Sequence, residues 1–254
     1  MGDGPGKLHH PASGGGRRVT GIDYRISPED DLGGGSPKDK CRANLAAIEL
    51  LQRLQAEDRP ATEEEQGILV RYVGWGGLPQ VFATHDDPTW QLERERLREL
   101  LGPEEIKAAQ ASTLNAHYTS RAVISAIYDG VQRLGFTHGR VLEPALGIGH
   151  FFGLMPDEMR ANSSLAGVEL DPTSAAIARA LYPKAQISQQ GFEQTNFPDG
   201  RFDLAISNVP FGNYSVFDPD FNRHHFLIHD YFFAKALDKV RPGGRVALDT
   251  SMGT

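Results

Sequence analysis

Two glutamates occupy positions where an acidic side chain is costly unless something pairs with it. Glu143 ends the apolar run 141–142 and Glu169 follows Val168, so each acid closes a segment with the pattern of a buried strand. A buried carboxylate needs a charged or hydrogen-bonding partner. The ammonium group of a ligand would pair with Glu143, although a salt bridge or a helix cap would serve as well. Glu169 stands where an acid accepts hydrogen bonds from both ribose hydroxyls of a nucleoside.

A turn with two glycines follows the first glutamate. Pro144 and Ala145 lead into Gly147 and Gly149, and glycine lets a backbone pass close to a bound ligand. The turn lacks a complete Gly-x-Gly-x-x-Gly, which argues against a bound pyrophosphate and therefore against NAD. A nucleoside that also carries an ammonium group suits both glutamates. We therefore expect S-adenosylmethionine as the cofactor.

Phe192 and Glu193 follow the third predicted strand. The topology expected below places them beside the adenine of the cofactor, where an apolar face and an acceptor for the amino group would be useful. A surface loop with one buried aromatic residue explains the pair equally well.

The phrase Asn208-Val209-Pro210-Phe211 closes another predicted strand. An aromatic amine is a poor nucleophile because its lone pair is delocalised into the ring. The side-chain oxygen of Asn208 and the backbone carbonyl of Val209 can accept both N–H groups and draw the nitrogen toward a tetrahedral geometry. Phe211 can stack on the base, which must leave its helix to reach the site. The alternative is an ordinary turn, since Asn and Pro are turn formers.

The pattern of strands and helices predicts where these residues lie. After Gly135 the apolar spacing alternates between the two types of element, which is typical of an α/β fold with a parallel sheet covered on both faces. We predict strands near 140–145, 165–170, 185–188, 202–207 and 244–250, and helices near 150–160, 172–182 and 229–240. Ligands of such sheets bind at the carboxyl ends of the strands, where the strand order reverses. The three motifs all fall at such ends.

The rest of the chain divides into two further parts. Residues 1–39 are rich in Gly, Pro and Ser and predict a mobile tail, in which 19–26 could form a strand or clasp. Residues 40–111 carry apolar side chains at helical spacing and predict a small helical domain. Residues 112–254 then form the catalytic domain. The sequence stops just past the fifth predicted strand, so we expect that domain to be incomplete at its C-terminal side.

Composition restricts the class of protein. The 254 residues carry a formal net charge of −7, which counts against a module that grips duplex DNA alone but not against a catalytic module. The single cysteine, Cys41, and the absence of a signal segment or a long apolar run indicate a reducing compartment, the bacterial cytoplasm. One cysteine and scattered histidines give no zinc-site spacing.

Together the motifs resemble a known enzyme family. Residues 143–149, 167–171 and 208–211 are similar to the corresponding motifs of the amino-methyltransferases with an Asn-Pro-Pro-Tyr/Phe motif, above all the adenine-N6 DNA methyltransferases. The segment 71–78 resembles the opening of the large helicase–methyltransferase fusions of plasmids, phages and integrative elements. The resemblance covers about residues 20–254 and implies a Rossmann-like S-adenosylmethionine-dependent methyltransferase sheet.

The resemblance also implies substrate and partners. Residues 116–120 resemble the segment in which Thr119 touches the carboxylate end of the cofactor. DNA would be the substrate, with an adenine flipped into the site, and helicase and recognition regions would lie outside this chain. Val209 departs from the motif, which usually has proline there, but its carbonyl remains. The alternatives are an amino-methyltransferase of protein glutamine or RNA guanine, and an inactive fragment or interaction module of a mobile element.

Overall fold

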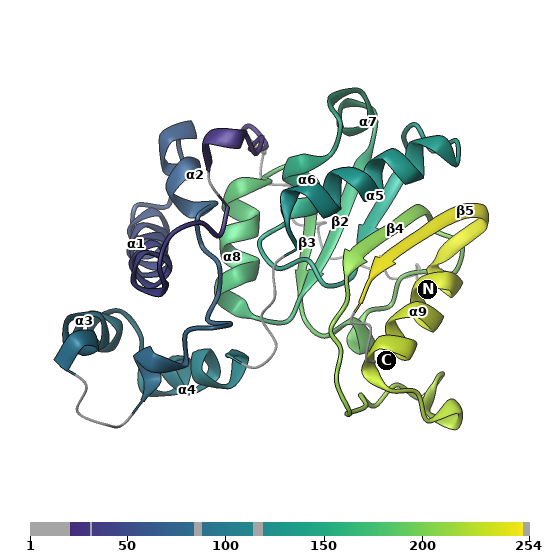
Figure 1. Ribbon diagram of the computed structural model, residues 1–254. Coiled ribbons are helices and arrows are strands. Elements are labelled where there is room, and N and C mark those ends of the chain that lie inside the picture. Colours follow the sequence, from purple (N-terminus) through teal and green to yellow (C-terminus); the bar gives the residue numbers. More distant parts are fainter. Residues whose placement is uncertain (1–20, 31, 84–87, 114–118, 251–254) are drawn as a thin grey trace, which may run out of the picture.

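The computed structural model describes residues 21–30, 32–83, 88–113 and 119–250 (Figure 1). Within them, five parallel strands form one sheet in the order β3-β2-β1-β4-β5, so the order reverses between β1 and β4. The strands are β1 (Arg140–Glu143), β2 (Ser164–Glu169), β3 (Gln186–Gln189), β4 (Phe202–Asn208) and β5 (Val240–Asp249). The prediction of an α/β fold with a parallel sheet is confirmed.

Helices cover both faces of this sheet (Figure 1). Successive strand residues point to opposite faces. Val141 and Leu204 therefore face a core shared with α5 (Arg121–Arg133), α6 (His150–Leu154) and α8 (Pro172–Leu181). Leu142 and Ala205 face a second core under α9 (Ile228–Lys239). The doubly covered sheet explains why its central strands read as continuous apolar runs.

Several element boundaries differ from the prediction. The helix expected over 150–160 is two short helices, α6 and α7 (Asp157–Ala161), because Pro156 cannot continue a helix at that point. β5 begins at Val240, directly after α9, rather than at 244. Helix α5 buries Ile124, Tyr128 and Val131, whereas Leu134, at its C-terminal end, is exposed.

A group of helices precedes the sheet. They are α1 (Pro37–Ala56), α2 (Glu63–Leu69), α3 (Gln91–Leu100) and α4 (Pro103–Ser112). Single 3₁₀ turns lie at Pro28–Asp30, Pro79–Phe82, Pro88–Trp90, Phe192–Gln194 and Asn222–His224. α1 starts before residue 40 because Ser36 and Asp39 form a reciprocal capping box around Pro37. Cys41 is buried in this helix.

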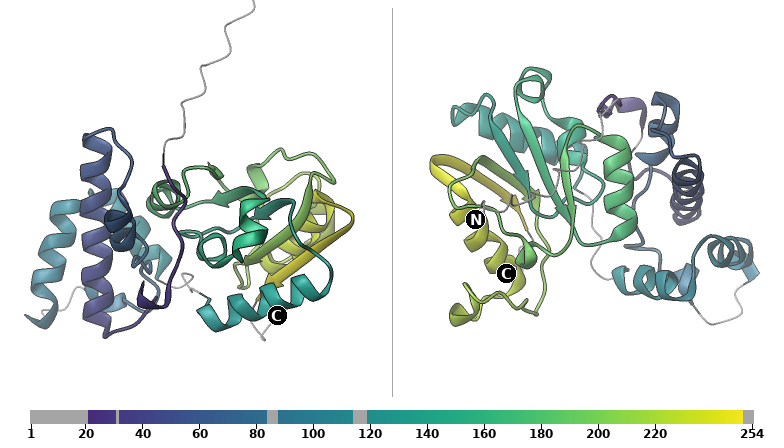
Figure 2. Two further views of the ribbon diagram at one scale, coloured as in Figure 1. Left: turned by 90° about the horizontal axis from the view of Figure 1, so that it is seen from above. Right: turned by 180° about the vertical axis from the view of Figure 1, so that it is seen from behind.

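The helical group packs on the sheet part through α8 and an extended segment. Figure 2 shows residues 21–30 running between the two parts. The Tyr24 amide donates to the Leu181 carbonyl at 2.8 Å, and the Ile26 amide donates to the Gly153 carbonyl at 3.1 Å. The Ile26 side chain is buried in the core that α6 and α8 share. The segment therefore acts as a backbone clasp across two helices of the sheet part.

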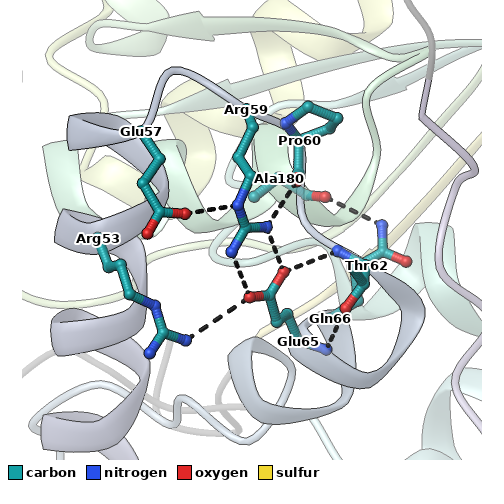
Figure 3. Close-up of polar contacts among 8 residues, drawn as sticks. All are labelled: Arg53, Glu57, Arg59, Pro60, Thr62, Glu65, Gln66 and Ala180. Carbon is teal, nitrogen blue, oxygen red and sulfur yellow. Dashed lines mark hydrogen bonds and ion pairs between the residues drawn. The ribbon is translucent and has the colours of Figure 1, made fainter.

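Gln66 of α2 completes this junction (Figure 3). Its side-chain nitrogen donates to the carbonyls of Ile22 at 2.9 Å, Ala180 at 3.0 Å and Leu181 at 3.3 Å. Gln66 is buried, its bond to the Leu181 carbonyl is buried, and its bonds to the Ile22 and Ala180 carbonyls are partly buried. One amide thus joins three separate parts of the chain: the clasp, the helical group and the end of α8.

None of the helices in the described residues is long and apolar enough to cross a membrane. The division of the chain into a tail, a helical domain and a catalytic domain stays a prediction.

Replacing Gln66 by leucine should lower the free energy of unfolding by about 1–3 kcal/mol, because buried carbonyls lose their donor. The measurement is urea denaturation at fixed temperature. Gln132→Leu, on the exposed side of α5, is the matched control and should change stability by less than about 0.5 kcal/mol. Equal midpoints for Gln66→Leu and the control would contradict the role of this amide.

Candidate functional site

The predicted site residues meet at one edge of the sheet. Glu143 ends β1, Glu169 ends β2 and Asn208 ends β4. Because these strands are parallel neighbours, their carboxyl ends lie together at the point where the strand order reverses. The expected placement of the three motifs is therefore what the structure shows.

Glu143 is an interior acid, 1% exposed. Within the part of the chain that the structure describes, its Oε2 has no hydrogen-bond partner. Burial raises the pKa of the Glu143 carboxyl well above its usual range, and the nearby Glu169 raises it further. The alternatives of a salt bridge or a helix cap therefore gain no support from the described residues. Such a carboxyl is suited to a cationic ligand.

Glu169 is held by the backbone on both sides. Its Oε2 accepts from the Gly147 amide and its Oε1 accepts from the Asp171 amide, each at 2.7 Å. Burial raises the pKa of the Glu169 carboxyl to about 7, although these hydrogen bonds act in the opposite direction. Asp171 itself caps α8 by accepting from the Ser174 amide, as expected of an acid before Pro172. The orientation of Glu169 is thus set before any ligand binds.

Glycine is favoured at positions 147 and 149 of the turn for different structural reasons. Gly147 has φ +56° and donates to Glu169 through its amide. Gly149 has φ +86°, and a side-chain carbon there would lie 2.5 Å from the Tyr182 ring. The left-handed conformation of both residues favours glycine. Gly149 is therefore needed for packing against α8 whether or not a ligand approaches the turn.

A serine that the sequence reasoning missed joins two motifs. Ser207 Oγ accepts from the Ala145 amide at 3.3 Å and donates to the Ala145 carbonyl at 3.1 Å. Ser207 is fully buried in β4, directly before Asn208. A polar side chain at an otherwise apolar strand position was the available signal. This pair of bonds fixes the glycine turn against the strand end that carries Asn208.

The four residues 208–211 leave β4 with different burial. Val209 is 1% exposed and belongs to the core under α9, whereas Asn208, Pro210 and Phe211 are half-buried. The Val209 amide donates to the Asp249 carbonyl of β5 at 3.0 Å. A proline has no amide hydrogen and could not make this bond. Valine at this position therefore has a structural reason.

The remaining predicted residues divide between core and edge. Phe192 is 2% exposed, and its ring packs against Tyr231 and Phe232 of α9 with Lys235 Nζ 5.1 Å away. These contacts favour the packing alternative over a contact with adenine. Glu193, the next residue in the chain, is half-buried. In the glycine turn, Ala145 and Gly147 are also half-buried, whereas Pro144 is buried.

Thr119 lies just before α5. Its Oγ1 is buried and has no hydrogen-bond partner within the described residues. Residues 114–118, which include most of the segment read as a cofactor motif, lie outside the described part of the chain.

The donor set suits the expected cofactor. Glu143 offers a buried carboxylate for an ammonium group, Glu169 offers a preoriented acid for ribose hydroxyls, and Thr119 offers a buried hydroxyl. The glycine turn keeps its backbone close to Glu169. A cavity of about 480 Å³ lies elsewhere, at the amino ends of β2 and β3, and contains none of these residues.

Comparison with known proteins agrees with this description. A family described as "Methyltransferase domain" matches residues 142–248, which contain both glutamates and Asn208. The chain is also 25% identical over 217 residues to "Defense against restriction protein B" of Escherichia phage P1. The similarity covers 83% of this chain, but the chain spans only about 8% of that protein's length.

Similar solved structures share the general architecture at low identity. A Listeria monocytogenes protein described as a class I S-adenosylmethionine-dependent methyltransferase is 15% identical, over 83% of this chain and 73% of that one, with a TM-score of 0.42. TrmN from Thermus thermophilus is 22% identical, over 54% and 40%, with a TM-score of 0.39. These scores are too low to bear on the chemistry. The family match, residues 142–248, and the five-stranded parallel sheet lie in the same part of the chain, and both agree with S-adenosylmethionine as the expected cofactor.

Proposed function

We propose that this chain methylates the exocyclic N6 amine of adenine in DNA, with S-adenosylmethionine as the methyl donor. The observation that carries the proposal is the Ser207–Ala145 pair of hydrogen bonds. It joins the residues that would hold the amine to the turn that would hold the cofactor. At the same edge, the Glu143 oxygen that has no hydrogen-bond partner among the described residues supports the cofactor half of the proposal.

The residues of the chain would act mainly by positioning. When bound, the cofactor supplies an electrophilic methyl group on a sulfonium. The Asn208 side-chain oxygen and the Val209 carbonyl would accept the two N–H groups of the amine, and Phe211 would stack on the base. The amine nitrogen would take the methyl group as the carbon–sulfur bond breaks with its electron pair going to sulfur, and the nitrogen would then lose a proton to solvent. Holding both reactants in line supplies most of the rate enhancement.

The similarity to the phage P1 protein supports a proposal for the biological role. That protein is named for defence against restriction, and the sequence motifs resemble those of enzymes carried by mobile elements. Methylation of adenine would protect such an element's DNA where a restriction enzyme reads the unmodified base.

Replacing Asn208 by alanine tests the role of the amine-holding motif. Methyl transfer to DNA should fall by at least about 100-fold, because a preorganised acceptor at the reacting nitrogen is lost. Affinity for S-adenosylmethionine should stay within a few-fold, as calorimetric titration would show. Incorporation of labelled methyl into DNA, followed by nucleoside analysis for N6-methyladenine, measures transfer. Label that enters a glutamine peptide or RNA instead of DNA would overturn the proposed substrate.

The pH dependence of cofactor affinity tests Glu169. Ribose hydroxyls donate to the ionised carboxylate, so affinity should rise as pH passes upward through about 7, where Glu169 ionises in the free protein. Binding should release a proton below this pH. Glu169→Gln should bind more weakly and lose the step, as titrations in buffers of different ionisation enthalpy would show. An unchanged pH profile in the variant would contradict the assignment.

The same carboxyl affects stability in the absence of cofactor. The folded chain keeps the Glu169 proton up to about pH 7, whereas the unfolded chain loses it near the ordinary value of 4.5. Between these two pH values the native state therefore binds more protons than the unfolded state. The contribution of Glu169 to the stability of the fold falls as pH rises through this range. The free energy of unfolding of wild type, relative to Glu169→Gln, should decrease over that range.

Changing Val209 to the proline of the usual motif should lower stability by about 1–3 kcal/mol, because the bond to the Asp249 carbonyl is lost. Urea denaturation measures this, and Val209→Ala, which keeps the amide, separates the hydrogen bond from side-chain packing. Higher methylation by Val209→Pro with unchanged stability would show that the departure from the motif is a catalytic defect instead.

A further inference from the structure

The loop between β4 and α9, residues 212–227, begins directly after the proposed amine-holding motif. Its two limbs are tied together: the Ile228 amide donates to the Tyr214 carbonyl at 2.9 Å, and Ser215 Oγ donates to the Phe226 carbonyl at 2.8 Å. The loop therefore folds back on itself at the carboxyl edge of the sheet.

The fold of this loop encloses a cavity of about 340 Å³. Its lining is mostly aromatic and includes Phe217, Phe221, Phe226, Tyr231 and His225. Phe217, which belongs to this lining, is 78% exposed. Burying a large aromatic ring away from water lowers the free energy. An exposed ring at a cavity therefore indicates a binding surface.

A buried ion pair holds this aromatic pocket in shape. Lys235 Nζ lies 2.9 Å from Asp218 Oδ2, and the Tyr231 hydroxyl donates to the same oxygen at 2.6 Å. Both charged side chains are almost fully buried. A buried pair of this kind is retained only where its hydrogen bonds are satisfied. Here Asp218 Oδ1 also accepts from the Asp220 amide at 3.1 Å.

The backbone around Asp218 adds further order. The amides of Phe221 and Asn222 donate to the Asp218 carbonyl, and the Asp218 amide donates to the Asn222 side chain. His225, at the cavity, has φ +52°, a conformation that non-glycine residues seldom adopt. The backbone of the loop around the pocket is thus fixed by hydrogen bonds before any ligand binds.

We propose that this aromatic pocket stacks the base next to the flipped adenine, and that the substrate is single-stranded or locally opened DNA. The proposal rests on the proposed function. Phe217 lies six residues after Phe211, so the two rings are separated by at most about 20 Å of chain. Aromatic side chains bind unpaired bases of any sequence by stacking.

The charge of the chain favours this mode of binding. With a net charge of −7, the chain has little general attraction for phosphates, on which duplex binding depends. Within the loop, the exposed Arg223 is offset by the exposed Asp220. Stacking therefore has to supply most of the grip, and the dependence of affinity on salt should be shallow.

The test uses the 254-residue chain and short single-stranded oligonucleotides with one adenine. One set is intact, a second has an abasic site 5′ of the adenine, and a third has it 3′. Binding is followed by fluorescence anisotropy with S-adenosylhomocysteine present, and methyl transfer is measured on the same oligonucleotides. The proteins are wild type, Phe217→Ala, Phe217→Trp and the control Leu92→Ala, whose leucine on α3 is 70% exposed.

For wild type, one of the two abasic sites should weaken binding about tenfold, the usual effect of one lost stacking contact. Phe217→Ala should bind the intact oligonucleotide about tenfold more weakly and lose nothing more at that abasic site. Phe217→Trp and Leu92→Ala should behave as wild type, and duplex should bind more weakly than single strand.

Two failures are distinguishable. Wild type that methylates the oligonucleotides, but is indifferent to both abasic sites or shows losses that add to that of Phe217→Ala, would overturn the pocket and leave the proposed function standing. Wild type that methylates duplex DNA but none of the single-stranded oligonucleotides would likewise overturn only the pocket, whereas wild type that methylates neither would overturn the proposed function, and the pocket with it.

Discussion

The carboxyl edge of this sheet is organised around an acid that the described residues leave uncompensated. Glu143 is buried, one of its oxygens has no partner among them, and the nearest charge that affects it is a second acid, Glu169. Two carboxylates in a poorly solvated site disfavour their own ionisation. The free chain therefore gives up stability at this edge, and a cation bound there would restore it. A local conflict of this kind is characteristic of functional sites rather than of cores.

The interior around Glu143 strengthens the effect. Burial raises the pKa of the Tyr128 and Tyr182 hydroxyls well above the usual range, and the Glu143 carboxylate raises each further. Tyr182 also packs so closely on Gly149 that no side chain fits there. Tyr182 therefore takes part both in the packing of the turn and in the electrostatics around Glu143.

How far the sequence could predict the structure follows from the range of each interaction. Strand ends at Glu143, Glu169 and Asn208 were predictable, because apolar runs and the polar residues that close them are local features. Ser207 and Gln66 were not, since each bonds to a carbonyl more than 40 residues away in the chain. The position of Phe192 in the chain suggests a contact with adenine, whereas the packing of its ring against Tyr231 and Phe232 of α9 could not be predicted from the sequence.

The match to the methyltransferase family starts at residue 142, yet part of what shapes the site precedes it. Ile26 approaches Gly153 of α6 so closely that a side chain at that glycine would meet it, and the Gln66 amide binds the last carbonyls of α8. α6 begins directly after the glycine turn, and Tyr182 follows the last residue of α8. Through these contacts, the clasp and α2 stabilise the positions of α6 and α8, the two helices that pack behind the glycine turn. A segment limited to the family match would lose this support, so the helical group is best understood as part of the site's scaffold.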